Sequence, residues 1–157
     1  MQRKVFTIEE VKRKMEHYCV YQDRCHQEVE EKLREFSLIV IAKEEILLHL
    51  MEHDFLNETR FAQSYARGKF RIKKYGKQRI IRELKRRNIT AYNIKKALLE
   101  IEEDVYRATA FELAIKKNAS LTESNTFKKR KKLFDHMVRK GYEYDLINEA
   151  IDAVLNK

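Results

Sequence analysis

A central stretch of the chain, running from Asn57 to Ile89 as NETRFAQSYARGKFRIKKYGKQRIIRELKRRNI, decides the fold. Its apolar residues recur with the period of an α-helix, which predicts two amphipathic helices joined at Tyr75-Gly76. The stripe expected to be buried in the first helix comprises Phe61, Tyr65, Gly68 and Ile72, with Ala62 and Ala66 beside it. Because glycine inside a helix costs ~1 kcal/mol against alanine, Gly68 is expected to mark a close helix crossing. The stripe expected in the second helix comprises Ile80, Ile81 and Leu84.

The same two helices carry rows of cations on faces that are not expected to be buried. In the first helix the row is Arg60, Arg67, Arg71 and Lys74, and in the second it is Arg79, Arg82 and Arg86. Each row keeps helical spacing, so its members lie on one side of the helix. This pattern predicts a surface that meets negative charge.

The rest of the chain also reads as helical. Its 157 residues include no proline and three glycines, which is less turn punctuation than a sheet-rich fold needs. The first expected helix begins at Thr7, where Thr7 and Glu10 form a capping box. The others cover residues 26–36, 40–53, the two central segments, 90–103, 104–118, 126–140 and 143–155. Thr90 is the expected N-cap of the sixth, and Ala108, Phe111, Ala114 and Ile115 are the expected inner face of the seventh.

The nine expected helices repeat in threes. Leu33, Leu84 and Met137 occupy equivalent positions, and four residues after each come Ser37, Asn88 and Gly141, which are expected to end a helix. The sequence therefore predicts an all-α fold of three tandem three-helix repeats in an elongated, curved array. We expect the repeats to cover residues 1–55, 56–103 and 104–157.

Charge is distributed unevenly among these repeats. The whole chain carries a formal net charge of +9. Counted by repeat, the balance is −3 for residues 1–55, +9 for 56–103 and +3 for 104–157. An acidic end next to a strongly basic middle indicates an oriented partner rather than general stickiness.

Composition also limits the setting in which the protein works. No apolar run approaches the ~18 residues that a membrane-spanning helix needs, and the first residues lack the apolar segment of a secretory signal. Two cysteines without an export signal indicate a reducing, cytoplasmic location. We expect no membrane contact, and we expect a monomer because no helix forms a zipper.

The central stretch resembles the RecX family. The resemblance rests on Asn57-Glu58-x-Arg60-Phe61-Ala62-x-x-Tyr65-x-Arg67, followed by Tyr75-Gly76-x-x-Arg79-Ile80-x-x-Glu83-Leu84-x-x-x-x-Ile89. The match extends over nearly the whole chain, since the family is described as tandem three-helix repeats. The chain departs from the family at four positions. It has Asn57 where the family often has an acidic residue, Asp54 and Asn88 where the family often has glycine, and Lys77 where it often has proline.

What the resemblance implies is a regulatory protein rather than an enzyme. RecX-like proteins bind RecA filaments on single-stranded DNA and limit filament extension, ATP hydrolysis, recombinase and co-protease activity, within DNA repair and the SOS response. Phosphates in such a filament attract Lys and Arg. The expected binding row is Arg67, Arg71, Lys74, Lys77, Arg79, Arg82, Lys85 and Arg86, and a second patch is Lys128, Lys129, Arg130, Lys131 and Lys132. Any single one of these cations can equally be a solvated surface residue.

Two other functions fit the same helical pattern. One is a stand-alone DNA-binding module, with residues 77–87 and 90–101 acting as a helix-turn-helix reader and Thr90, Tyr92, Asn93 and Lys95 reading bases. The other is a helical scaffold for a different acidic partner. Phe70 and Tyr75 lie among the cations and can either stack on unpaired bases or pack beneath the basic side chains, the second being the more common role.

Motifs for catalysis or metal binding are missing from the sequence. It contains no Ser-x-Gly elbow, Walker-type glycine loop or HExxH, and adjacent carboxylates such as Glu44-Glu45 and Glu102-Glu103 point apart on a helix. His17, Cys19, Cys25 and His26 form the one cluster of metal-ligand types, but their spacing is not that of a zinc site. We therefore expect no enzyme activity, no cofactor and no metal.

Overall fold

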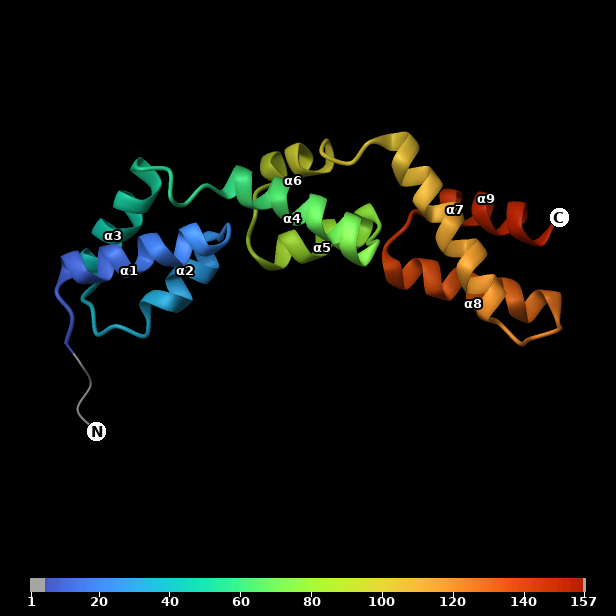
Figure 1. Cartoon of the computed structure of the whole chain (residues 1–157), viewed down its shortest axis with the longest axis horizontal. Helices are drawn as coiled ribbons and strands as arrows, with labels where there is room; N and C mark the ends of the chain where they lie inside the picture. The colour runs from blue at the N-terminus through green and yellow to red at the C-terminus, as the bar shows by residue number, and fades with distance from the viewer. Residues whose placement is uncertain (1–4, 157) are drawn as a thin grey trace.

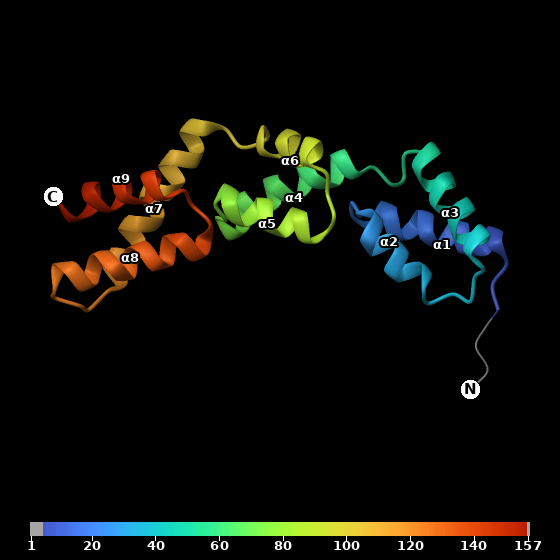
Figure 2. The ribbon, with the colours of Figure 1, turned by 180° about the vertical axis from the view of Figure 1, so that it is seen from behind.

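The computed structural model describes residues 5–156, and over that range it contains nine helices and no strand. The helices lie in three groups of three along an elongated molecule, with α1–α3 at one end and α7–α9 at the other (Figures 1 and 2). Their bounds are α1 Ile8–Tyr21, α2 His26–Leu33, α3 Val40–Glu52, α4 Glu58–Lys73, α5 Lys77–Arg86, α6 Ala91–Leu98, α7 Glu103–Ser120, α8 Thr126–Lys140 and α9 Tyr144–Leu155. The predicted all-α array of three-helix units is confirmed. Within the described range no helix is both long and apolar enough to cross a bilayer.

We refer to α1–α3, α4–α6 and α7–α9 as the first, second and third units. The boundaries predicted at residues 55/56 and 103/104 stay our proposal for where one unit gives way to the next.

Capping side chains explain four of the nine helix starts in the described range. Thr7 and Glu10 form the predicted capping box at α1, and the Thr90 side chain accepts from the amide of Asn93 at α6. Asn57 and Asn125 cap α4 and α8 in the same way. Each cap satisfies an amide that the helix itself leaves unpaired.

The second helix of each unit is predicted to end in the same way, and this holds for α5 and α8 but not for α2. Asn88 and Gly141 have φ values of 58° and 102°, and the amides that follow them bond back to Leu84 and Met137 at 3.1 and 3.2 Å. These bonds are those of a Schellman motif. Ser37 is different, because it does not have a positive φ and the amide of Leu38 bonds to Phe36 instead.

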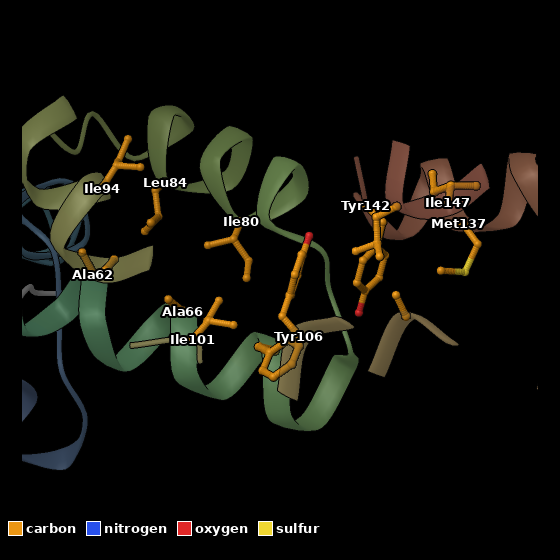
Figure 3. Packing of buried hydrophobic residues seen from close by; sticks show 14 of the residues in the cluster. Ala62, Ala66, Ile80, Leu84, Ile94, Ile101, Tyr106, Met137, Tyr142 and Ile147 are labelled. Atoms are coloured by element: carbon orange, nitrogen blue, oxygen red, sulfur yellow. The ribbon is translucent and has the colours of Figure 1, made fainter. Parts of the chain in front are cut away.

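The buried residues form two separate cores. The first unit has its own, which includes Val11, Met15, Val29, Leu33, Ile46 and Leu50. The second and third units share a larger core that includes Phe61, Ile80, Leu84, Tyr106, Met137, Tyr142 and Ile147, part of which Figure 3 shows. Cys25, at the start of α2, belongs to this shared core and not to that of its own unit.

Three predicted details of packing are wrong. In α4 the buried residue of the last turn is Phe70, whereas Ile72 is 78% exposed. No close crossing occurs at Gly68, since a Cβ there would meet nothing within 4 Å. In α7 the buried face is Tyr106, Thr109, Ala110 and Ala114, and Ala108 and Ile115 are exposed. Both helices therefore turn slightly differently toward the core than periodicity alone predicts.

The second and third units meet backbone to backbone. The amide of Gly76 donates to the carbonyl of Lys140 at 2.7 Å, and the amide of Gln78 donates to that of Gly141 at 2.9 Å. A Cβ on Gly76 would lie 2.3 Å from the carbonyl carbon of Gly141. Such a distance is impossible, so the start of α5 can rest on the end of α8 only because glycine occupies this position.

Two stacked tyrosines complete this junction. The rings of Tyr106 and Tyr142 lie 5.1 Å apart between the two units (Figure 3). The Tyr106 hydroxyl accepts from the amide of Lys77 at 2.9 Å and donates to Glu143 at 2.7 Å, while the Tyr142 hydroxyl donates to the carbonyl of Lys74 at 2.8 Å. Burial raises the pKa of both phenols, so they stay neutral donors at physiological pH.

Replacing Gly76 with alanine tests the backbone contact. The φ of Gly76 is −75°, which alanine adopts readily, so destabilisation would report the clash with Gly141 and not backbone strain. We expect Gly76→Ala to lower the free energy of unfolding by about 1–3 kcal/mol. The matched control Gly68→Ala should leave it unchanged or raise it by up to about 1 kcal/mol, because its Cβ meets open space. Thermal denaturation followed by circular dichroism measures both, and equal stability of the two variants would contradict the contact.

Replacing Tyr106 with phenylalanine removes one hydroxyl from the same junction. The amide of Lys77 and the carboxylate of Glu143 then lose their partner, which we expect to cost about 1–3 kcal/mol of unfolding free energy. Tyr92→Phe is the control, since Tyr92 is exposed and its hydroxyl makes no hydrogen bond with the described residues. A denaturant titration that gave the same midpoint for both variants would show that these bonds do not hold the junction.

Candidate nucleic-acid interface

The outer faces of α4 and α5 carry the unpaired part of the predicted row. On α4 the buried residues Phe61, Ala62, Ala66 and Phe70 lie on the side opposite Arg67 and Arg71. Four members of the predicted row are exposed and form no ion pair with any residue from 5 to 156. These are Arg71, Lys74, Arg82 and Lys85. We call these four the free row. Their charges are available to an anionic partner without breaking an internal contact.

Two further members of the predicted row are exposed but paired. Arg67 lies 3.3 Å from Glu100, and Arg86 lies 3.4 Å from Glu83. Exposed pairs of this kind contribute little to stability, so an incoming phosphate can compete for either arginine. Arg67 and Arg86 can therefore join the free row in binding an anionic partner, with only a small loss of stability from breaking their ion pairs.

Lys77 and Arg79 are directed into the junction instead. The Lys77 ammonium lies 2.9 Å from Glu103 and 4.6 Å from the centre of the Tyr106 ring. Arg79 donates to the carbonyl of Arg139 at 3.1 Å and covers the Tyr75 ring at 4.0 Å. Both side chains hold the second and third units together, a role that periodicity did not reveal.

The predicted second patch lies on α8 in the third unit and is partly neutralised. Arg130 pairs with Asp152, Lys131 lies 3.6 Å from Asp135, and Lys132 lies 3.7 Å from Glu123. Lys128 is exposed and Lys129 is partly buried, and neither makes an ion pair within the described range. The patch therefore offers fewer unpaired positive charges to a partner than its five consecutive cations indicate.

The aromatic residues among the cations pack beneath them. Phe70 is buried in the shared core, and Tyr75 is partly buried beneath Arg79 with the Lys69 ammonium 5.9 Å from its ring centre. Phe70 is therefore not available to stack on a base.

Sequence reasoning missed several residues that lie beside the free row. Arg139 and Lys140 come from α8, and the Lys140 ammonium donates to the carbonyl of Lys73 at 3.0 Å. The exposed ring of Tyr144 lines, with Arg82, a groove of about 360 Å³ between α5 and the α8–α9 turn. These residues lie beside α4 and α5 because Gly76 packs on Gly141. No local sequence pattern predicts that contact.

The alternative of a helix-turn-helix reader loses two of its four candidate residues. Thr90 is the N-cap of α6, and the Asn93 side-chain carbonyl accepts from the Thr59 hydroxyl at 2.6 Å. Tyr92 and Lys95 remain exposed on α6. Two of the four side chains that would read bases at the start of this helix are therefore already engaged within the protein.

The junction between the first and second units lacks the backbone contact that joins the second and third units. We call the first of these junctions open and the second closed. Cys25 is the N-cap of α2 as Gly76 is of α5, and Asn88 ends α5 as Gly141 ends α8. No backbone hydrogen bond joins these positions among the described residues. Between the units lies a cleft of about 760 Å³, with Glu28 and Glu31 on one wall and Arg86 and Arg87 on the other.

Arg60 bridges this open junction. Its guanidinium donates to Asp23 and to Asp54, both at 2.9 Å, and to the carbonyl of Phe55 at 3.2 Å. A hydrogen bond from Asn57, together with the charge of Arg60, lowers the pKa of the Asp54 carboxyl below its ordinary value. Arg60, a cation of the predicted first-helix row, is thus engaged in connecting the α1–α2 and α3–α4 turns.

The cysteines and histidines near the first turn do not gather into a site. Cys19 is buried in the core of the first unit and Cys25 in the shared core. In the described part of the chain no three His, Cys, Asp or Glu side chains are grouped so as to hold a metal ion. Burial raises the pKa of each thiol to about 11.

Comparison with known proteins gives a consistent family. The model of the second three-helix domain of RecX matches residues 57–98, and that of the third matches residues 104–151, which together make up more than half of the chain. The regulatory protein RecX of Bacillus cytotoxicus is 29% identical over 137 residues, or 87% of this chain and 51% of that protein. That of Clostridioides difficile is 27% identical over 135 residues, or 85% of this chain and 63% of that protein.

Solved structures agree in fold. The crystal structure of RecX from Lactobacillus salivarius has a TM-score of 0.83 and 25% identity, covering 94% of this chain and 96% of that chain. A second crystal structure, of a regulatory protein RecX, has a TM-score of 0.80 at 20% identity, covering 97% of this chain and 81% of that one, and shows the shared fold. By sequence, the chain spans 51% and 63% of the two curated relatives named above.

Alkylation of the two thiols tests their burial. With a pKa of about 11 in place of the ordinary value of 9.0, each thiol has a thiolate fraction at pH 8 that is roughly a hundredfold smaller. We expect iodoacetamide to label native protein at least a hundredfold more slowly than urea-unfolded protein, as measured by mass spectrometry over time. Labelling of either cysteine at the unfolded rate would contradict the packing around α1 and α2.

Proposed function

Because the chain belongs to the RecX family, we propose that it is a regulatory protein that binds RecA filaments on single-stranded DNA and limits their activity. The activities affected would be filament extension, ATP hydrolysis, strand exchange and co-protease function. The family is one of regulatory proteins and not of enzymes, so the effect would come from binding alone, without a cofactor. We propose that the protein acts in the cytoplasm as a monomer.

The free row is the observation that supports this proposal most directly. Arg71, Lys74, Arg82 and Lys85 lie exposed on neighbouring helices of the most basic unit, without internal partners in the described range. Lys and Arg that neutralise phosphates release condensed counterions, and this makes binding favourable without reading sequence. Such a row fits the DNA of a filament better than one fixed base sequence.

The mechanism we propose is steric. A row of three units is long compared with its width (Figure 1), so it can contact more than one subunit of a helical filament while the second unit lies against DNA phosphate. A protein bound across neighbouring subunits opposes both their rearrangement during ATP hydrolysis and the addition of new ones.

The ATPase rate of RecA on single-stranded DNA tests the function as a whole. We expect titration of this protein to suppress the rate at less than one molecule per RecA subunit, because one bound molecule would affect several subunits. An unchanged rate, together with tight binding to one duplex sequence, would support a stand-alone DNA reader in its place.

Charge reversal tests the role of the basic helices. We expect Arg82→Glu/Arg86→Glu to weaken filament binding at least tenfold, since two phosphate-facing charges change sign, while helix content stays the same. The matched control is Arg13→Glu/Arg34→Glu, which makes the same change of charge at exposed positions of the first unit that form no ion pair with described residues. Fluorescence anisotropy at several salt concentrations gives both affinities. Equal affinity of the two double variants would exclude α5 from the interface.

A further inference from the structure

Helix α3 is apolar on two sides, of which only one is covered. Its inner face, Ala42, Ile46 and Leu50, is buried, and Ile46 and Leu50 belong to the core of the first unit. Its outer face exposes Val40, Ile41, Leu48 and Met51. An amphipathic surface helix is ordinarily polar on its outer face, so α3 has an apolar face that the first unit itself does not use. We call these four residues the α3 stripe.

The four side chains lie along one side of the helix. Ile41 and Leu48 are seven residues apart, which places them nearly above each other two turns apart, with Val40 and Met51 beside them. The stripe is roughly 16 Å long at 1.5 Å per residue. Exposed apolar side chains grouped on one side of a helix mark an interaction site more often than isolated exposed residues do.

The third unit shows that the fold does not require this stripe. Positions equivalent to Val40, Ile41, Glu44 and Leu48 are occupied in α6 by Ala91, Tyr92, Lys95 and Leu99, and in α9 by Tyr144, Asp145, Asn148 and Asp152. In α9 three of the four are polar. In α6 the pattern is like that of α3, since Tyr92 and Leu99 are exposed with Lys95 between them, where α3 has Glu44. A helix in this place of the repeat can therefore carry polar residues outward, and α3 differs from α6 in having acidic instead of basic side chains beside its exposed apolar residues.

Charge around the stripe indicates which kind of partner covers it. Glu44 lies within the stripe, Glu45 and Glu52 border it, and all three are exposed. Residues 1–55 carry three more acidic than basic side chains, the opposite of the second unit. A nucleic acid or another polyanion is repelled here. The fitting partner is a protein surface with an apolar centre and Lys or Arg at its rim.

We propose that the α3 stripe docks on the protein component of the filament while the free row lies on its DNA. This assignment rests on the proposed function and adds a division of labour to it. The acidic, apolar first unit recognises protein, and the basic second unit recognises phosphate. Loss of the stripe then weakens binding to the filament but not to DNA alone.

The test replaces stripe residues without changing net charge. Ile41→Ser/Leu48→Ser alters side chains that are 73% and 54% exposed, and the control Leu99→Ser/Ile115→Ser alters two that are 79% and 53% exposed elsewhere. Val40→Ser/Met51→Ser gives a second, independent disruption of the stripe. Binding to preassembled RecA filaments and to a naked thymidine oligonucleotide is measured by anisotropy, after thermal melts confirm that each variant folds.

We expect both stripe variants to bind filaments at least tenfold more weakly and the oligonucleotide within twofold of the unchanged protein, while the control matches it on both. Filament binding that is unchanged in both stripe variants would overturn the docking assignment and leave the proposed function standing. If the unchanged protein binds the oligonucleotide but not the filament, the proposed function fails together with the assignment. A dimer of the unchanged protein in sedimentation that the stripe variants abolish would overturn the assignment by showing that a second copy covers α3.

Discussion

The start of α5 rests on the end of α8 through two backbone hydrogen bonds, and the arrangement of the basic surface depends on this contact. The amides of Gly76 and Gln78 are among those that a helix leaves unpaired at its start, and here carbonyls of the next unit satisfy them. The absence of a side chain on Gly76 permits the approach. Once α5 is fixed in this way, Lys77 and Arg79 point into the junction, Arg82 is exposed beside the groove that Tyr144 lines, and Lys85 is exposed to solvent. The same contact brings Arg139, Lys140 and Tyr144 of the third unit beside them.

The equivalent contact between the first two units takes a different form for a steric reason. Cys25 and Asn88 occupy the positions that glycine occupies at the closed junction, and each adds a Cβ where the closed geometry leaves no room for one. A cleft separates the units instead, and Arg60 connects them through Asp23 and Asp54. One repeated fold thus gives a tight junction and an open one. The difference lies in two positions at each junction, which are glycine at the tight one and Cys25 and Asn88 at the open one.

Much of the fold could be predicted from sequence because it is local. Helix periodicity, the capping residues Thr7 and Thr90, and the repeat of Leu33, Leu84 and Met137 each depend on a short segment, and the structure contains the expected helices there. The position of the cations on the outer faces of α4 and α5 followed from the same periodicity. The roles of Lys77 and Arg79 did not, because they depend on which turn of the next unit lies against Gly76. Phe70 displaced Ile72 from the core for a related reason, since the Tyr106 ring that it meets comes from α7. The outward apolar residues of α3 were visible in the sequence, but periodicity alone does not show which apolar side of a helix the fold covers.

The division of the core into two clusters gives the chain two cooperative units of unequal size. The hydrophobic cluster of α1–α3 is almost closed on itself, whereas the cluster of α4–α9 combines two thirds of the helices. In repeat proteins, opening occurs most readily where the fewest neighbours share the core. Amide exchange in α1–α3 should therefore proceed through a local opening that leaves the basic helices folded.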